Sequence, residues 1–353
     1  MKGYAMLEIN KPGWVEKPKP VAGPLDAIVR PIAVAVCTSD THTLHGGGGD
    51  LRDRILGHEA VGIVEEVGSE VKRIKPGDKV VVNCVTPDWT ALSVQEPNEN
   101  CSHDHGPLAS FKFLFQKDGV FAEYFHVNYA DANLAILPEG VSVEDALMTT
   151  DMMSTAFHGV ENAEIKYGDT VVVYGIGPVG LMAIAGAALA GAGRIIGIGT
   201  RENCAKLARE YGATDIVSYK DGDIPTQVKK LCGGLVDKVI LAGGTCDCID
   251  ESLKMVKANG IISNIVFFDP SETVKFPAPD WHLGMGNITI KSGFCPGGAR
   301  RIERLLELIK HGRVKPGKML NYRFEGFESI PEAVKVMDEK PRDLIKPYVY
   351  IGE

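Results

Sequence analysis

From residue 170 onward, short apolar runs alternate with helical stretches, and this alternation restricts the fold more than any other feature. Helices are expected between these runs, for example over 179–190 and 204–211. Strands that are apolar on both faces and separated by helices predict a doubly wound parallel sheet. The expected strands are 171–174, 195–198, 215–219, 238–241, 261–266 and 288–291.

The chain before this region has a different pattern. It is rich in Val, Gly and Pro, with apolar runs at 27–35, 61–67 and 79–83 and tight turns between them, which predicts a mostly β domain. The alternation ends near 295–298, and an amphipathic helix around 302–309 and a strand over 345–351 follow. We therefore expect one domain from 1–154 with 295–353, and a second from 155–294.

Composition excludes several classes of function. The chain of 353 residues carries a net charge of -8 and has no basic cluster, which argues against nucleic-acid or anionic-membrane partners. It has no apolar run long enough to span a membrane and no signal-peptide pattern at its start. The eight cysteines are scattered, as expected for reduced thiols. We expect a cytoplasmic protein.

A glycine-rich segment joins the first predicted strand of the sheet to the helix that follows. Its order and context match the G-x-G-x-x-G turn that places a pyrophosphate at a helix N-terminus, although a plain glycine turn is the alternative. Its residues are Gly175, Ile176, Gly177, Pro178, Val179 and Gly180.

The end of the second predicted strand indicates which dinucleotide binds. NAD enzymes usually place an acidic residue here for the ribose 2′-hydroxyl. This chain has Gly199, Thr200 and Arg201 instead. Gly199 leaves room for a phosphate, Thr200 can donate a hydrogen bond, and Arg201 offers a charge-assisted fork. This set predicts NADP; the alternative is an arginine that merely faces solvent.

Potential metal ligands crowd two short segments of the β domain. Cys37 and His42 lie in the first segment, and His58 and Glu59 follow in a Gly-His-Glu motif. A lone Cys or His is more often structural, but a thiolate and an imidazole together suit zinc. A catalytic zinc needs three protein ligands and one open position.

With these motifs in view, the whole chain resembles the zinc-dependent medium-chain alcohol dehydrogenases. Within that family it is most similar to the NADP-dependent secondary alcohol (isopropanol) dehydrogenases of anaerobic bacteria and protists. The resemblance implies a GroES-like catalytic domain, a Rossmann coenzyme domain and a homotetramer. The stretches that carry it are 1–6, 31–42, 55–62, 86–89, 117–121, 150–159 and 295–298.

The resemblance also implies roles for individual residues. Cys37, His58 and Asp151 correspond to the zinc ligands, with Asp151 where other members carry a second cysteine. Glu59 stands beside the metal and approaches it during turnover. Asp40 corresponds to the carboxylate that orients His58. Ser39 and His42 correspond to the proton relay, and Tyr219 to a further contact with the 2′-phosphate.

The expected pocket residues Val85, Phe111 and Phe294 are apolar, which favours short secondary alcohols and ketones. Phe111 stands where the family places Trp, and Phe294 where it places Leu. One alternative is a zinc polyol or amino-alcohol dehydrogenase, whose pocket needs more polar groups. Another is a catalytically silent dinucleotide sensor, which would have lost a ligand or the relay.

Many family members carry four closely spaced cysteines that bind a structural zinc. The corresponding window here has only Cys101, with His103 and His105 nearby. Their number and spacing favour a flexible surface loop over a metal site, so we expect no structural zinc.

Overall fold

The computed structural model describes residues 1–95 and 102–353, which form two compact units. The first unit comprises Met1–Ser154 and Cys295–Glu353, and the second comprises Thr155–Phe294. Cys101 lies outside the described residues. Among the helices of the described residues, none combines the length and the apolar character needed to cross a membrane.

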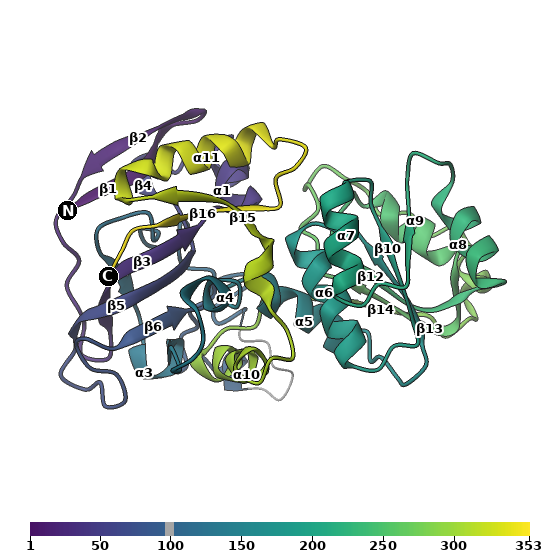
Figure 1. Cartoon of the computed structure of the whole chain (residues 1–353), viewed down its shortest axis with the longest axis horizontal. Coiled ribbons are helices and arrows are strands. Elements are labelled where there is room, and N and C mark those ends of the chain that lie inside the picture. Colours follow the sequence, from purple (N-terminus) through teal and green to yellow (C-terminus); the bar gives the residue numbers. More distant parts are fainter. Residues whose placement is uncertain (96–101) are drawn as a thin grey trace. The chain divides into compact units, whose positions relative to one another are not determined.

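The second unit is built on a parallel sheet. Its strand order is β11-β10-β9-β12-β13-β14, the arrangement of a doubly wound dinucleotide-binding fold, which confirms the predicted fold class. Helices α6 and α7 lie on one side of the sheet and α8 and α9 on the other (Figure 1). The strands are β9 (Thr170–Tyr174), β10 (Arg194–Ile198), β11 (Asp215–Val217), β12 (Val236–Leu241), β13 (Val256–Asn264) and β14 (Thr289–Ser292). The helices are α6 (Pro178–Leu189), α7 (Glu202–Glu210), α8 (Ile224–Cys232), α9 (Asp247–Leu253) and the short η1 (His282–Gly284).

Both faces of this sheet are covered because its central strand has no polar face. Val171, Val172 and Val173 of β9 are all fully buried. Eight successive residues of α6, from Gly180 to Ala187, are buried, so this helix is enclosed on all sides. This packing positions the N-terminus of α6 at the end of β9.

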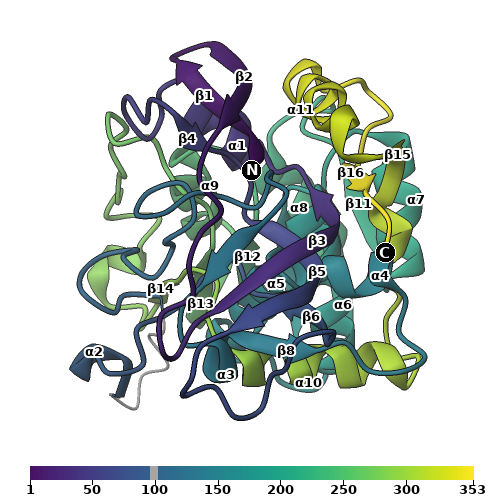
Figure 2. The ribbon, with the colours of Figure 1, turned by 90° about the vertical axis from the view of Figure 1, so that its left-hand side faces the viewer.

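The first unit is mostly β, as predicted. Its larger sheet has the order β15-β16-β3-β5-β6-β8, with β7 also paired to β3, and a smaller sheet has the order β2-β1-β4. Figure 2 shows β3, β5, β6 and β8 side by side. The strands are β1 (Lys2–Glu8), β2 (Lys11–Glu16), β3 (Ala27–Ala35), β4 (Arg54–Ile55), β5 (Glu59–Val67), β6 (Lys79–Val82), β7 (Phe125–Val127), β8 (Leu134–Ile136), β15 (Leu320–Glu325) and β16 (Lys346–Tyr350).

Short helices connect these strands, and α5 (Met152–Asn162) runs across the boundary between the residues of the two units. The amphipathic helix expected around 302–309 is α10, and its four apolar positions are buried. The remaining helices are α1 (Thr38–Leu44), α2 (Leu92–Gln95), α3 (Ala130–Asn133), α4 (Val143–Leu147), α10 (Ala299–Lys310), α11 (Ile330–Glu339), η2 (Pro316–Met319) and η3 (Phe327–Ser329).

Several predicted strands differ from the structure at their ends, β11 and β13 among them. The strand predicted over 215–219 ends at Val217, so Tyr219 lies in the exposed turn that follows. The strand predicted over 261–266 begins at Val256 and ends at Asn264. Its first half is largely exposed and polar, so it carries no hydrophobic signal, and the Asn264 side chain bonds the backbone of Val266 as the chain turns away.

Candidate functional site

The first candidate ligand, Cys37, caps the N-terminus of α1. Its backbone N–H donates to Oδ2 of Asp40 at 2.8 Å. The other oxygen of Asp40 accepts from the backbone N–H of Gly57 at 3.2 Å and contacts Nδ1 of His58 at 3.1 Å. One buried carboxylate therefore ties the start of α1 to the segment that leads into β5.

This contact also fixes the orientation of His58. The imidazole is 1% exposed, and with Nδ1 bound by Asp40 its Nε2 is directed toward Oδ2 of Asp151, 3.5 Å away. Burial by itself lowers the pKa of His58, but the charge of Asp40 and hydrogen bonds with Asp151 and Asp40 raise it well above its ordinary value. The surroundings of the ring therefore favour a positive charge.

Four donors converge at this point. Cys37, His58, Glu59 and Asp151 each offer one ligand atom, and these atoms all lie within 4.8 Å of one another. They come from the start of α1, the start of β5 and the residue before α5. A thiolate, an imidazole nitrogen and carboxylate oxygens match the donor types that zinc takes. The residues present therefore fit a zinc ion.

Lys346 is part of the same cluster and was missed by sequence reasoning. Its Nζ lies 2.5 Å from Oε1 of Glu59, and both side chains are at most 1% exposed. Strands β16, β3 and β5 are adjacent, with Ala35 paired to both Tyr348 and Glu59, and this register brings the two residues together. A single lysine in the otherwise apolar segment 344–351 was the available signal.

Lys346 and Glu59 each stabilise the charged form of the other. Burial lowers the pKa of Lys346, but the charge of Glu59 and then of Cys37 outweighs this effect and holds the pKa above its ordinary value. Burial raises the pKa of Glu59; Lys346 opposes that shift, and Asp151 adds to it. Oε2 of Glu59 has no hydrogen-bond partner among the described residues. The acids are thus crowded enough for a cation to be stabilised beside them.

The residues of the expected relay both lie on α1. The hydroxyl of Ser39 is 3.4 Å from Nε2 of His58, at the edge of the donor cluster. His42 is exposed, one helical turn further along. The helix therefore leads from the cluster to the surface of the first unit.

Two of the three expected pocket residues lie in the first unit. Val85 is fully buried. The ring of Phe111 stands edge-on to His58, with 5.2 Å between the ring centroids and 89° between the planes. Phe294 is the last residue of the second unit. Phe111 thus gives the donor cluster an apolar neighbour.

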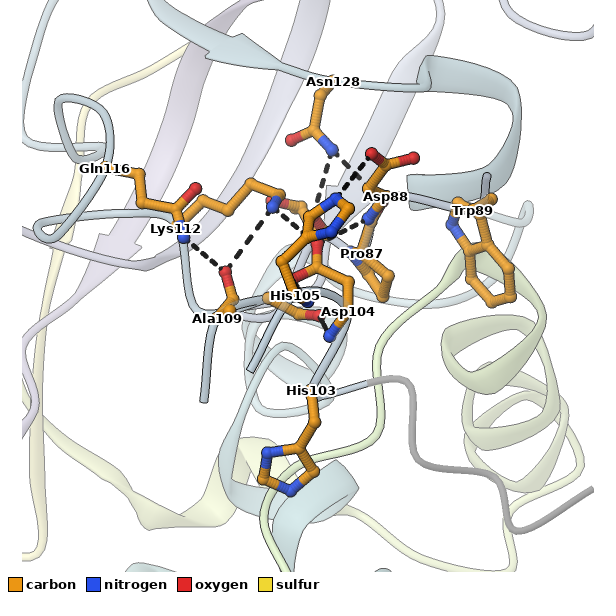
Figure 3. A network of polar contacts seen from close by, with 12 residues as sticks. Pro87, Asp88, Trp89, His103, Asp104, His105, Ala109, Lys112, Gln116 and Asn128 are labelled. Atoms are coloured by element: carbon orange, nitrogen blue, oxygen red, sulfur yellow. Dashed lines mark hydrogen bonds and ion pairs between the residues drawn. The ribbon is translucent and has the colours of Figure 1, made fainter. Parts of the chain in front are cut away.

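A polar network arranges the loop that carries Phe111 (Figure 3). Figure 3 shows Asp88, His105 and Lys112 gathered at Asp104, which is 3% exposed. Asp104 accepts from Nζ of Lys112 at 2.6 Å and from the backbone N–H of Asp88 at 2.8 Å. Sequence reasoning missed this network because aspartate and lysine in a polar loop carry no distinctive signal.

His103 and His105, expected in a flexible loop, each make a local hydrogen bond. Nε2 of His105 is 2.9 Å from Oδ2 of Asp88, and Nδ1 of His103 accepts from the backbone N–H of Leu108 at 2.8 Å. Figure 3 shows the His103 ring pointing away from the Asp104 network. Within the described residues, the loop is thus held by side chains around the partly buried ion pair of Lys112 and Asp104.

The glycine-rich segment in the second unit forms a tight turn between β9 and α6. Gly175 has φ +80°, and Gly177 precedes α6, which begins with Pro178. A Cβ atom at Gly180 would lie 1.7 Å from the carbonyl oxygen of Gly175, so only glycine fits there. Ile176 and Val179 complete this turn, which leaves the backbone at the helix N-terminus open to a phosphate.

The residues expected to bind the 2′-phosphate gather beside this turn. The hydroxyl of Thr200 donates to that of Tyr219 at 2.9 Å. Arg201 precedes α7, and its guanidinium lies 3.7 Å from the position that a Cβ atom on Gly177 would take. A hydroxyl pair and a guanidinium are therefore available together at this edge of the sheet.

The structure corrects one part of the reasoning about Gly199. A Cβ atom there would lie 2.2 Å from Cγ1 of Ile176, so the volume beside Gly199 is already filled by a side chain. The absence of an acidic residue still removes a repulsive charge, and any larger residue at this position would have to displace the side chain of Ile176.

Comparisons with known proteins agree with this architecture. The description "Alcohol dehydrogenase GroES-like domain" matches residues 23–139, and "Zinc-binding dehydrogenase" matches residues 178–311. The chain is 54% identical to the NADP-dependent isopropanol dehydrogenase of Clostridium beijerinckii, over 99% of this chain and 100% of that one. The chain belongs to the zinc-dependent alcohol dehydrogenase family.

Two further comparisons extend along the whole of this alcohol dehydrogenase. It is 54% identical to the NADP-dependent isopropanol dehydrogenase of Thermoanaerobacter brockii, over 100% of both chains. Its structure is similar to that of the alcohol dehydrogenase TADH from Thermus sp. ATN1, with a TM-score of 0.87 and 27% identity over 99% of this chain and 100% of that one. The family assignment thus covers both units of the dehydrogenase.

Proposed function

We propose that this dehydrogenase reversibly transfers a hydride between a short secondary alcohol, or the corresponding ketone, and NADP. The observation that carries the proposal is the convergence of a thiol, an imidazole and two carboxylates within 4.8 Å in one unit. The glycine turn and the Thr200–Arg201–Tyr219 group in the other unit support the choice of cofactor. We assign catalysis to the first unit and coenzyme binding to the second.

Cys37, His58 and Asp151 would hold the zinc, with Glu59 beside them. When bound, zinc supplies Lewis-acid polarisation of the substrate oxygen, which lowers the pKa of an alcohol. Asp40 keeps Nδ1 of His58 occupied, so that Nε2 is presented to the cluster. Lys346 holds Glu59 by one oxygen and compensates its charge where both side chains are buried.

The proton of the alcohol leaves by way of α1. Ser39 accepts it at Oγ while its own hydroxyl proton passes on to His42, which releases a proton to solvent from the exposed face of the same helix. NADP, when bound, supplies the nicotinamide carbon that accepts the hydride. In the first unit, Val85 and Phe111 offer apolar side chains, which suit a small monoalcohol better than a polyol or amino alcohol. Phe294, at the end of the second unit, is the third apolar residue that the family resemblance assigns to substrate binding.

A steady-state screen of 2-propanol, 2-butanol, ethanol and acetone, each with NADP(H) and NAD(H), tests this function. We expect the highest kcat/KM for the secondary alcohols and acetone with the phosphorylated cofactor. One methylene in such a pocket changes binding by about 1–3 kcal/mol, so the preference should be graded. Equal or greater efficiency with ethanol, or a preference for NAD, would refute the proposal.

We further propose that the enzyme is a cytoplasmic homotetramer, as the resemblance to the isopropanol dehydrogenases implies. Sedimentation velocity of the purified enzyme tests the oligomer. A mass near four times the 38.0 kDa of one chain is expected, and a monomeric species at micromolar concentration would contradict it.

A further inference from the structure

A second group of soft donors lies beside the proposed zinc ligands, in the same unit. Sγ of Cys84, Sγ of Cys295 and a carboxylate oxygen of Asp151 all lie within 4.8 Å of one another. Both thiols are almost completely buried, at 1% and 0% exposure. Neither cysteine has a part in the function proposed above, whereas Asp151 belongs to both donor groups.

The backbone around these thiols is firmly held. The amide of Asn83 donates to the carbonyl of Pro296 at 2.9 Å, and its oxygen accepts from the backbone N–H of Val85 at 2.9 Å and from the Cys295 thiol at 3.4 Å. The backbone N–H of Cys84 donates to the carbonyl of Thr150 at 2.9 Å. The three segments that supply the donors are thus fastened to one another, so the group is already assembled.

The spacing of the thiols suits a shared metal ion. Two thiolates bound to one tetrahedral cation of the size of zinc, with bonds of about 2.3 Å, lie roughly 3.8 Å apart, and the larger Cd²⁺ separates them slightly more. Both separations lie within the 4.8 Å that contains the three ligand atoms. A disulfide would bring the sulfurs to about 2.05 Å and would require the fastened segments to move. Thiolates select soft cations, and a carboxylate can complete the set.

We propose that Cys84, Cys295 and Asp151 form a second metal position, which takes a thiophilic divalent cation such as Cd²⁺ and whose occupation inhibits the enzyme. Binding displaces one proton from each thiol to solvent; the two thiolates balance the charge of the divalent cation, and Asp151 adds a third ligand atom. Inhibition follows because Asp151 is shared, so the second cation draws it away from the catalytic group. Only this inhibitory consequence depends on the proposed function.

Titration of the purified holoenzyme, containing one zinc per chain, with cadmium chloride tests the site. We expect thiolate-to-cadmium charge-transfer absorbance that saturates at one cadmium per chain, with zinc retained and turnover falling in parallel. Cys84→Ala and Cys295→Ala should lose this absorbance and should need at least tenfold more cadmium for half-inhibition. Cys248→Ala, which alters a buried thiol of the second unit, is the matched control and should titrate like the wild type.

A measurement on the wild type alone guards against variants that fail to fold. X-ray absorption at the cadmium edge should detect two sulfur neighbours per cadmium. The proposal is overturned if cadmium releases the zinc and has a single sulfur neighbour, if no cadmium binds, or if the absorbance survives in Cys295→Ala or disappears in Cys248→Ala. Loss of alcohol oxidation in the untreated enzyme would instead count against the proposed function, because the cadmium signals do not depend on turnover.

Discussion

The donor cluster of the first unit and the phosphate-binding candidates of the second differ in how far the fold hides them from water. Asp40, His58, Glu59 and Lys346 are all at most 1% exposed and bind one another. Tyr219, by contrast, is 57% exposed, and its contact with Thr200 lies at the surface. In the buried cluster each charge depends on its partner, so a substitution there should disturb folding and metal binding together. At the exposed group it should alter only the affinity for the ligand.

The strongest test of this contrast removes the softest donor. Cys37→Ser should lower the zinc content well below one per chain and reduce turnover by on the order of a thousandfold, since Lewis-acid stabilisation is worth several kcal/mol. Metal analysis and steady-state kinetics measure both. Cys204→Ser, at a buried thiol of the second unit, is the control and should keep its zinc and activity. Undiminished zinc content in Cys37→Ser, or full activity after removal of zinc, would contradict the ligand assignment.

A second test separates the role of Lys346 from that of the metal ligands. Lys346→Met leaves Glu59 as an uncompensated buried charge, so we expect the free energy of unfolding to fall by about 3–5 kcal/mol. Adding Glu59→Gln removes that charge and should restore most of the free energy of unfolding that Lys346→Met loses. Urea denaturation of the zinc-free proteins measures both effects. If the double variant is no more stable than Lys346→Met, the two residues do not act as a pair.

These residues also show how far sequence reasoning reaches. The strand at Ala27–Ala35 and the glycine turn at 175–180 were predicted because their signals are local. Lys346 and Glu59 are 287 positions apart, and only the adjacency of β16, β3 and β5 joins them. No period or spacing in the chain encodes such a contact.

The donor cluster itself was predicted only in part from local pattern. Cys37 and His58 stand out as a thiol and an imidazole in two nearby motifs, but Asp151 has no spacing rule and entered through the family resemblance. Cys84 and Cys295 were missed for the same reason, because each is a lone cysteine in its own segment. Gly199 was interpreted as open space, and only the packed structure shows that Ile176 fills it.

Lys117, a partly buried lysine of the first unit, extends the comparison with Lys346. Nζ of Lys117 donates to the amide oxygen of Asn128 at 2.8 Å and lies 4.4 Å from the ring centroid of Phe113. Burial and then the charge of Lys112 lower the pKa of Lys117 to about 7, although Asp26 opposes the shift. Lys346, which bonds a carboxylate, shifts in the opposite direction. The partner therefore decides which protonation state a buried lysine favours.

Lys117 predicts a pH dependence of stability. Between about pH 7 and pH 10 the unfolded chain holds a proton on this amine that the folded protein has released, so the free energy of unfolding rises with pH. Lys117→Met should flatten that rise by on the order of a few kcal/mol. Urea midpoints across this interval measure it, with Lys335→Met as the exposed control. An unchanged slope would show that Lys117 titrates at its ordinary value in the folded protein.

A substitution in the exposed Thr200–Arg201–Tyr219 group should change only the affinity for the cofactor. Arg201→Ala removes a charged hydrogen-bond donor worth about 1.5–3 kcal/mol, so the affinity for NADP should fall roughly tenfold or more while NAD binding hardly changes. Fluorescence titration with each reduced cofactor measures this difference. Equal weakening of both cofactors would show that Arg201 does not recognise the phosphate. Gly199→Asp is a poorer test, because its Cβ would collide with Ile176 and disturb the glycine turn.

The smallest effect is expected at Tyr219. Tyr219→Phe removes the hydroxyl that accepts from Thr200 and, in the proposed complex, contacts the 2′-phosphate. A single hydrogen bond contributes about 0.5–1.5 kcal/mol net, so NADP should bind roughly twofold to tenfold more weakly. The free energy of unfolding should stay within about 0.5 kcal/mol of the wild type, because the side chain is largely exposed.

Thr200→Val should have a similar effect, and the double variant should be little worse than either single one, since the two hydroxyls bind each other. Additive losses would indicate that each hydroxyl contacts the phosphate independently, and a loss of stability would mean that the exposed group is tied to the fold as closely as the buried cluster.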